Sequence, residues 1–251
     1  MSMELSKNKI SELALLKQKK HRRQESKIVL EGQRLLLQLA EYGVFPQELY
    51  RLADYEVPSP LAEVADYICD ERAMERICDT LQPQGIAGLY GLPKPEFRGF
   101  SRAFYLDGIS DPGNMGTIFR LAIAFGIDAI LLSEDCADPA SPKVIRASLG
   151  AVYRLPYATL NPMALRLPGL MVIGTDAQAE HSLQEFRPRG RQPLLIVIGG
   201  EARGMSEEIK KRCIHHLRIE MSTAMESLNA AVAAGIIAHH LYIVDKLTDI
   251  I

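Results

Sequence analysis

The sequence predicts an α/β protein, and three features of the chain support that prediction. Short apolar runs typical of strands alternate with helical patterns from residue 26 onward. Residues 194–198 are continuously apolar, which suits a strand buried on both faces of a parallel sheet. Residues 91–99 are rich in glycine and proline and divide the chain. We therefore expect two α/β domains, residues 1–97 and 98–251, the second built on a parallel sheet covered by helices.

The first domain is expected to alternate strands and helices behind a basic N-terminal helix. Apolar residues at helical spacing around residues 10–17 precede a cluster of lysine and arginine. A strand, a helix and a strand are then expected at residues 27–31, 32–42 and 48–52, followed by short elements at 60–64, 67–69, 73–78 and 86–90.

The second domain is expected to contain five strands with helices between them, two of which are assigned residue ranges. Apolar runs predict the strands at residues 103–106, 129–132, 152–155, 170–174 and 194–198. Helical patterns cover residues 115–125 and 227–246, and the alanine-rich start of the last helix indicates tight packing in a core.

Composition and charge exclude several classes of protein. With 47% hydrophobic and 24% charged residues, the 251-residue chain is neither disordered nor collagen-like. It lacks a secretory signal pattern, and its longest apolar stretch is broken by His239 and His240, so we expect a cytoplasmic protein without a membrane span. The four cysteines show no zinc-binding spacing and are interpreted as free thiols, and no metal is expected.

The net charge of −2 conceals a basic N-terminal segment. Residues 1–35 carry nine lysines and arginines against four aspartates and glutamates. Cations of this kind gain affinity for an RNA backbone by releasing counterions, although an ordinary solvated helix face explains the cluster equally well. The candidate RNA contacts in this segment are Lys19, Lys20, Arg22 and Arg23.

Three loops of the second domain concentrate glycine and polar residues at the ends of predicted strands, where open α/β sheets bind ligands. The first is residues 107–116, in which Asn114 is suited to cap the following helix. Arg120 lies in the otherwise apolar part of that helix and must reach solvent or an anion.

The second loop, residues 199–206, nearly matches a phosphate-binding G-x-x-x-x-G-K-[ST] motif, but Met205 occupies the lysine position. A nucleoside triphosphatase is therefore disfavoured, and no G-x-G-x-x-G fingerprint indicates a nicotinamide or flavin cofactor. The third loop leads from residues 219–222 into the last helix, where Asn229 is expected to project from the first turn toward the other two loops.

In order and spacing, these three segments resemble the signature motifs of the SpoU (TrmH-like) family of RNA ribose 2′-O-methyltransferases, in the SPOUT superfamily. The resemblance covers roughly residues 100–246. It implies a SPOUT domain with a parallel sheet and a deep C-terminal trefoil knot, a homodimer, and S-adenosyl-L-methionine as cofactor. Residues 1–97 resemble, less specifically, the small ribosomal-protein-like RNA-binding domain that precedes this domain in many members.

The resemblance also assigns residues to the site. It places Asn114, Arg120, Glu201, Ser227 and Asn229 at the catalytic centre. Residues 143–151 resemble the family segment between the first two motifs, and Arg146 within it is a candidate RNA contact. The cofactor is expected to be held by backbone groups around Gly174, Thr175, Ile198, Gly199, Ile219, Met221 and Leu228.

The implied reaction is attack of a ribose 2′-oxygen on a sulfonium methyl group. Because the pKa of arginine lies above 12, we interpret Arg120 as binding the neighbouring phosphate and favouring the developing alkoxide, with Glu201 and Asn229 positioning Arg120 and the RNA. One departure from the family is Glu220, which stands where the third motif usually has proline.

We expect ribosomal RNA, 23S rRNA in particular, as the substrate. A tRNA 2′-O-methyltransferase and a non-catalytic RNA-binding assembly protein that kept the fold are the alternatives. The retained Asn114, Arg120, Glu201 and Asn229 speak against the non-catalytic alternative.

Overall fold

The structure is a computed structural model that describes residues 3–94, 96–97, 99–165, 168–188, 192–201, 203–222 and 224–248. By its internal contacts the chain forms two compact units. The first unit comprises residues 1–94 and 140–154, and the second comprises residues 95–139 and 155–251. The division near residue 95 lies close to the expected domain boundary, but residues 140–154, expected in the second domain, pack with the first unit.

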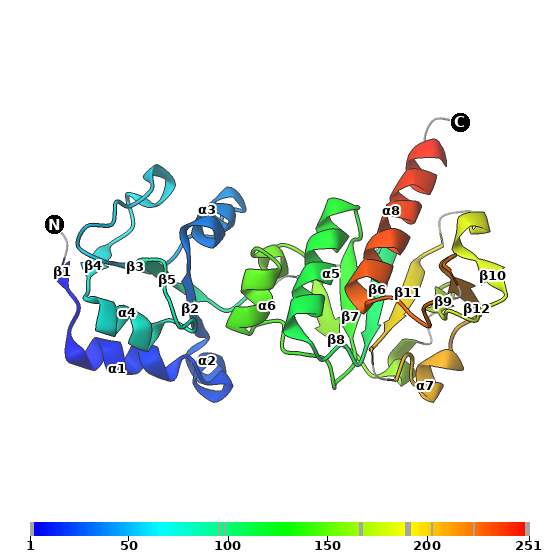
Figure 1. Ribbon diagram of the computed structural model, residues 1–251, viewed down its shortest axis with the longest axis horizontal. Helices are drawn as coiled ribbons and strands as arrows, with labels where there is room; N and C mark the ends of the chain where they lie inside the picture. Colours follow the sequence, from blue (N-terminus) through cyan, green and yellow to red (C-terminus); the bar gives the residue numbers. More distant parts are fainter. Residues whose placement is uncertain are drawn as a thin grey trace. The chain divides into compact units, whose positions relative to one another are not determined.

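The first unit is a five-stranded mixed sheet with helices on both faces (Figure 1). Its strands lie in the order β1-β4-β3-β5-β2, and β5 runs antiparallel to both of its neighbours. The strands are β1 (Met3–Glu4), β2 (Lys27–Glu31), β3 (Glu48–Arg51), β4 (Asp66–Ile68) and β5 (Ile86–Gly91). The helices of residues 1–94 are α1 (Lys7–Leu15), α2 (Lys19–Glu25), α3 (Gln33–Glu41), η1 (Ser59–Leu61) and α4 (Glu71–Ile77).

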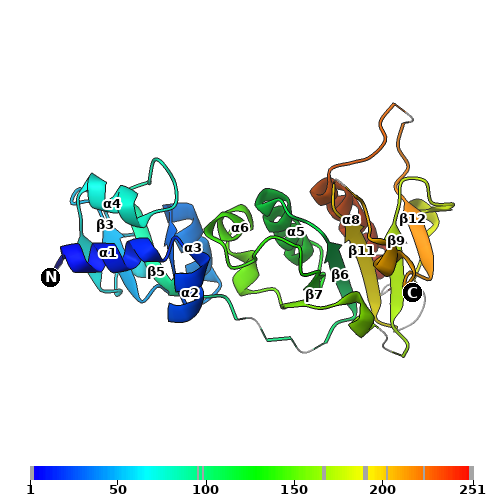
Figure 2. The ribbon, with the colours of Figure 1, turned by 90° about the horizontal axis from the view of Figure 1, so that it is seen from below.

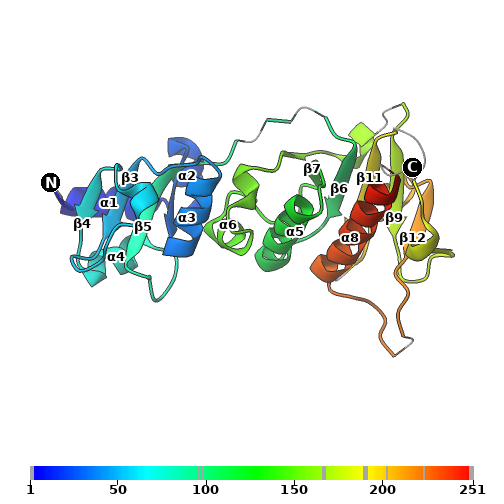
Figure 3. The same ribbon diagram turned by 90° about the horizontal axis from the view of Figure 1, so that it is seen from above.

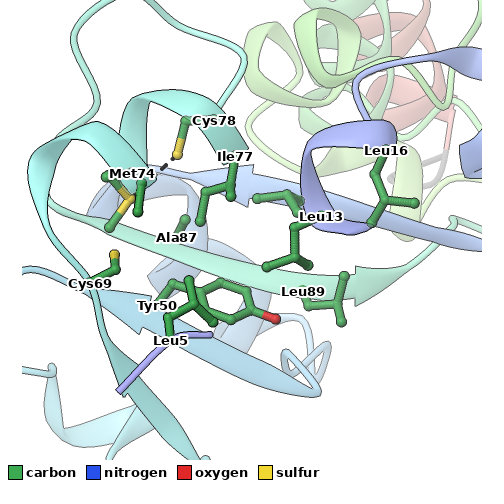
Figure 4. Close-up of a cluster of buried hydrophobic side chains, with 12 residues drawn as sticks. Leu5, Leu13, Leu16, Tyr50, Cys69, Met74, Ile77, Cys78, Ala87 and Leu89 are labelled. Atoms are coloured by element: carbon green, nitrogen blue, oxygen red, sulfur yellow. Dashed lines mark hydrogen bonds between the residues drawn. The ribbon is translucent and has the colours of Figure 1, made fainter. Parts of the chain in front are cut away.

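Apolar side chains on one face of this sheet form a core beneath α1 and α4 (Figure 4). Tyr50 and Leu89 of the sheet meet Leu13 of α1 and Met74 of α4 there. Alternate residues of the same strands, such as Leu30, face α3 on the other side, because successive side chains of a strand point to opposite faces. Burial on both faces explains why short apolar runs predicted these strands.

Residues 140–154 complete the first unit with helix α6 (Pro142–Ala147) and the 3-10 helix η2 (Ala151–Tyr153). The strand expected at residues 152–155 is therefore wrong. Gly150 has a φ of 80°, and a Cβ there would lie 2.7 Å from the Leu39 side chain, so the chain turns tightly against α3. An apolar run at such a turn has the same composition as a buried strand.

The second unit contains a seven-stranded sheet in the order β10-β12-β9-β11-β6-β7-β8, and every neighbouring pair is parallel. This confirms the predicted parallel α/β fold. The strands are β6 (Arg102–Asp107), β7 (Ala129–Leu132), β8 (Tyr157–Thr159), β9 (Met171–Thr175), β10 (His181–Ser182), β11 (Leu194–Gly199) and β12 (His215–Arg218).

Helices cover both faces of this sheet. Helices α5 (Pro112–Ala124) and α8 (Ala230–Thr248) pack side by side on one face (Figure 3). On the other face, Tyr105 and Val197 of the sheet belong to a core that includes Ile209 of helix α7 (Glu207–Lys210). Two short 3-10 helices connect an edge strand to an inner strand: η3 (Pro162–Leu165) lies between β8 and β9, and η4 (Leu183–Glu185) lies between β10 and β11.

Helix α8 begins at Ala230 rather than at Ser227, where the sequence predicted it. Its alanines approach α5 closely, as expected, and a Cβ added at Gly235 would lie 3.1 Å from Leu121 of α5. By length and composition, Ala230–Leu247 would suffice to cross a membrane, with a mean hydropathy of 1.3. Ala234, Ile237, Ala238 and Leu241 of this helix are buried in the second unit.

Candidate active site

The candidate site lies at one edge of the parallel sheet. Strands β12, β9, β11 and β6 are consecutive neighbours and run parallel, so their carboxyl ends meet at the same edge. The loops that follow β6, β11 and β12 are the three polar segments singled out in the sequence. After β12 the chain runs as a long connection before it returns to α8 (Figure 2).

Three polar side chains, one from each loop, are joined by hydrogen bonds. The Asn229 amide Nδ2 donates to Asn114 Oδ1 at 3.0 Å and to Glu201 Oε1 at 2.9 Å. Asn114 Nδ2 also donates to Glu201 Oε1. We call Asn114, Glu201 and Asn229 the amide–carboxylate cluster. Its members are 28 to 115 residues apart in the sequence, so only the sheet brings them together.

The N-terminal caps of α5 and α8 determine which hydrogen bonds Asn114 and Asn229 make. Asp111, not Asn114, caps α5, because its side chain accepts a hydrogen bond from the Asn114 backbone N–H at 2.8 Å. The predicted capping role of Asn114 is therefore wrong, and its amide is free to join the cluster. Asn229 Oδ1 accepts from the backbone N–H groups of Ala231 and Val232 and so caps α8.

Asp107, which sequence reasoning missed, ties the end of β6 to the loop that carries Glu201. Its carbonyl accepts from Gly200 N at 2.8 Å, and its buried carboxylate accepts from Ser206 N at 2.6 Å. A Cβ at Gly200 would lie 2.5 Å from the Gly108 carbonyl oxygen, so the two loops can approach only with glycine there. The sole sequence signal was an acidic residue at the end of an apolar strand.

The residues expected to hold a cofactor lie at the ends of three neighbouring strands. Gly174 and Thr175 end β9, Ile198 and Gly199 end β11, and Ile219 and Met221 follow β12. The Thr175 hydroxyl donates to the Val197 carbonyl at 2.8 Å and joins two of these ends. Among the described residues, none forms a hydrogen bond to the backbone of Ile219, Glu220 or Met221. Open backbone groups at this edge fit a small ligand recognised by main-chain hydrogen bonds.

Among the described residues, three expected site residues form no hydrogen bond with the cluster. Arg120 is exposed on α5, and in the described parts of the chain it has no hydrogen bond or ion pair. Six positions after Asn114, it lies about 240° around the helix from that residue. Ser227 is exposed and Leu228 is half-buried on the connection to α8.

The candidate RNA contacts of the first unit differ in exposure. Lys19, Lys20 and Arg23 are exposed on α2. Arg22 is 5% exposed and donates to the Leu16 and Lys17 carbonyls, so it belongs to the core rather than to the basic surface. Arg146 forms ion pairs with Asp79 at 2.9 Å and Glu31 at 3.4 Å.

The thiols near the site are not suited to act as nucleophiles. Burial raises the pKa of Cys213 to about 12 and also raises the pKa of Cys136. Both thiols are therefore protonated at neutral pH, and the thiolate is the reactive form. Within the described ranges, no three His, Cys, Asp or Glu side chains form a group that could hold a metal ion.

An open parallel sheet with a polar cluster and glycine-containing turns at its carboxyl edge defines an α/β enzyme that binds its ligands there. Comparison with known proteins identifies the kind of enzyme. The model of the SpoU rRNA methylase family matches residues 101–239, and the model of an MRM3-like substrate-binding domain matches residues 7–88. The chain belongs to the SpoU family of RNA methyltransferases.

Relatives match nearly the whole chain. An uncharacterized tRNA/rRNA methyltransferase of Synechocystis is 31% identical over 92% of this chain and 89% of its own length. The 23S rRNA (guanosine(2553)-2′-O)-methyltransferase RlmP of Bacillus subtilis is 28% identical over 95% of this chain and 98% of its own. The crystal structure of an AdoMet-bound rRNA methyltransferase of Sinorhizobium meliloti is 25% identical, with a TM-score of 0.78 over 95% of both chains.

Proposed function

We propose that this chain transfers a methyl group from S-adenosylmethionine to a ribose 2′-hydroxyl of ribosomal RNA. The observation that carries the proposal is the amide–carboxylate cluster, assembled from three loops beside the ends of β9, β11 and β12. The proposal agrees with the 2′-O-methyltransferase named for Bacillus subtilis and with the AdoMet-bound relative of Sinorhizobium meliloti.

The chain's own residues would hold the cofactor at the three strand ends. Backbone groups around Gly174, Thr175, Gly199, Ile219 and Met221 face the same edge and present donors and acceptors suited to an adenine ring and an amino acid. Ile198 and Leu228 would add apolar contact. When bound, S-adenosylmethionine supplies an electrophilic methyl group on a sulfonium sulfur.

Transfer forms an oxygen–carbon bond at the 2′-oxygen, breaks the sulfur–carbon bond and releases the hydroxyl proton. The amide–carboxylate cluster would orient the ribose, since it presents both donors and acceptors. Arg120 is exposed and free of partners among the described side chains, so it can bind the adjacent phosphate and stabilise negative charge on the oxygen. The proton would pass to the phosphate or to solvent.

The test is transfer of labelled methyl from S-adenosylmethionine to RNA from cells that lack this protein. We expect label on one ribose, mapped by nuclease digestion. Arg120→Ala is expected to lower the rate at least about 100-fold, the scale of a lost electrostatic contact to the reacting oxygen, and to leave cofactor affinity unchanged because Arg120 lies away from the three strand ends.

Arg154→Ala is the matched control, since this arginine belongs to the first unit and stacks over Tyr42. Unchanged turnover by Arg120→Ala would overturn the role given to Arg120. Label on tRNA alone would replace ribosomal RNA as the substrate. Cofactor binding without transfer to any RNA would favour the non-catalytic alternative.

The exposed basic residues of α2 would bind RNA phosphates. Lys19, Lys20 and Arg23 lie within five positions and are exposed. Each phosphate contact contributes about 0.7–0.9 to the slope of log affinity against log salt. Changing all three residues to alanine should therefore reduce that slope by about 2, as measured by RNA binding at several salt concentrations. Lys211→Ala, on the second unit, serves as the control, and an unchanged slope would make the cluster an ordinary solvated face.

A homodimer, a C-terminal knot and a cytoplasmic location are further parts of the proposal. A cleft of about 590 Å³ lies between α5 and α8, and Val232 and Ile236 beside it are exposed apolar residues. Such a face supports pairing with a second copy. The return of the chain from β12 to α8, which packs beside α5, supports the knot. The bacterial relatives that modify RNA support a location in the cytoplasm.

A further inference from the structure

One arginine at the end of β12 is bonded to two separate segments at the cofactor edge of the sheet. Arg218 Nη1 donates to the Ala179 carbonyl at 2.9 Å and also to the Glu180 carbonyl. Its Nη2 donates to Glu220 Oε1 at 2.9 Å. The guanidinium thus connects the turn after β9, residues 176–180, with the segment after β12, residues 219–222.

Hydrogen bonds within the turn after β9 hold it in a conformation that Arg218 can contact. Asp176 Oδ1 accepts from Gln178 N at 2.9 Å, and the Asp176 carbonyl accepts from Ala179 N at 3.2 Å. The Asp176 N–H donates to the Leu217 carbonyl, which fixes the start of the turn against β12. The turn therefore presents the carbonyls of residues 179 and 180 together, and an arginine can satisfy both.

The segment after β12 has few other restraints. In the described part of the chain, Ile219, Glu220 and Met221 make no backbone hydrogen bonds, and the next local bonds are those to Ser222. A proline at position 220, which the third motif usually has, would restrict this backbone by its ring. Glutamate does not restrict the backbone in this way, so ordering residues 219–221 costs more conformational entropy.

We propose that Arg218 and Glu220 are positioning residues that hold the two cofactor-binding segments together, in place of the rigidity of a proline. We call this pair the Arg218–Glu220 latch. It acts on Thr175, Ile219 and Met221 through the segments that carry them and rests on the proposed cofactor site. The pair is partly exposed, with side-chain exposures of 32% and 44%, so an isolated ion pair here would contribute little. Its effect comes from one guanidinium that joins Glu220 to the carbonyls of Ala179 and Glu180.

The latch predicts coupling between the two positions. Arg218→Met keeps an unbranched side chain but removes all three hydrogen bonds. Glu220→Pro removes the ion pair but restricts the backbone directly. The Glu220→Pro substitution is compatible with the fold. The Glu220 N–H donates to no described residue, and the φ angle of Glu220 is not positive. If the latch replaces the restraint of a proline, Arg218→Met should weaken cofactor binding much less in a chain that also carries Glu220→Pro.

The experiment measures binding of S-adenosylhomocysteine to the full chain by titration calorimetry, a readout independent of methyl transfer. We expect Arg218→Met to weaken binding about 10-fold, Glu220→Gln about 3-fold, and Glu220→Pro less than about 3-fold. Arg218→Met with Glu220→Pro is expected to bind within about 3-fold of the unaltered chain. Hydrogen exchange should show faster amide exchange at residues 176–180 in Arg218→Met, because the N–H groups of Asp176, Gln178 and Ala179 are hydrogen-bonded there, with the remaining amides unchanged.

Arg187→Met is the matched control, since Arg187 also donates to two backbone carbonyls, those of Gln184 and Phe186, outside the two segments. It should bind as the unaltered chain does. Equal binding by Arg218→Met and the unaltered chain would overturn the latch alone, as would loss of binding that Glu220→Pro fails to restore. Failure of the unaltered chain to bind S-adenosylhomocysteine would overturn the cofactor assignment and the latch with it.

Discussion

Asn229 combines a structural role and a role in the site within one side chain. Its oxygen caps α8 by accepting from two backbone N–H groups, and its nitrogen donates to Asn114 and Glu201. The cap fixes the orientation of the amide, because the oxygen must face the helix. The first turn of α8 therefore determines where the donor of the amide–carboxylate cluster points.

The two roles can be separated by substitution. Asn229→Ala should destabilise the protein by about 1 kcal/mol through loss of the cap, and Asn229→Ser should leave stability within about 0.5 kcal/mol because serine caps as well as asparagine. Both variants should lose methyl transfer at least about 10-fold, since neither reaches Glu201. Urea denaturation and the methyl-transfer assay measure the two effects. Full activity in Asn229→Ser would confine Asn229 to the cap.

At the scale of elements, helix α6 shows how a segment that lies between two motifs in the sequence is held by the first unit. Arg146 of α6 pairs with Asp79 and with Glu31, which is 5% exposed. Glu31 also accepts hydrogen bonds from the backbone and hydroxyl of Thr80. A buried carboxylate requires such partners. Arg146 is thus a link between α6 and β2, although its sequence context marked it as an RNA contact.

Removing that link should loosen residues 140–154. We expect Arg146→Met to destabilise the first unit by about 1–3 kcal/mol, because Glu31 stays buried without its cation. Urea denaturation and limited proteolysis within residues 140–154 would measure the change. Lys143→Met, exposed on the same helix, is the control. Weaker RNA binding by Arg146→Met at unchanged stability would instead establish Arg146 as an RNA contact.

At the scale of the whole molecule, the outer surface of α8 carries exposed apolar side chains. One side of the helix is buried in the second unit, yet Val232 and Ile236 are 51% and 39% exposed, and Tyr242, Ile243 and Leu247 continue this exposed apolar surface. Exposed apolar residues at this density on one helix are typical of an interface. The same apolar character gives α8 a hydropathy sufficient for a membrane span.

Introducing charged residues on the exposed surface of α8 should dissociate the proposed dimer. Val232→Asp with Ile236→Asp is expected to raise the dimer dissociation constant by at least about 100-fold, because two unpaired carboxylates would be buried at the interface. Sedimentation velocity at micromolar concentration measures the change. Leu81→Asp, at a residue 94% exposed in the first unit, should have no effect. A monomeric unaltered chain would contradict the dimer.

Much of the fold could be predicted from local patterns. Strands β2 and β7 have the predicted boundaries, and β6, β9 and β11 differ by one or two residues, because strands buried on both faces require apolar runs that are visible in the sequence. Strand β12 was not predicted, since His215, His216 and Arg218 break the apolar pattern. The apolar run at residues 152–155 predicted a strand that is absent from the described structure, because a buried turn requires apolar residues as a buried strand does.

The sequence by itself determined the α/β class, the three polar loops and the residue types at the candidate site, because these depend on local composition and spacing. Only the tertiary structure decided how those residues are used. It assigned the cap of α5 to Asp111 and released Asn114 for the cluster, buried Arg22, and joined Arg218 to carbonyls nearly forty residues away. These outcomes depend on which strand ends meet in the sheet, and strand order is set by packing between segments distant in the sequence rather than by any local pattern.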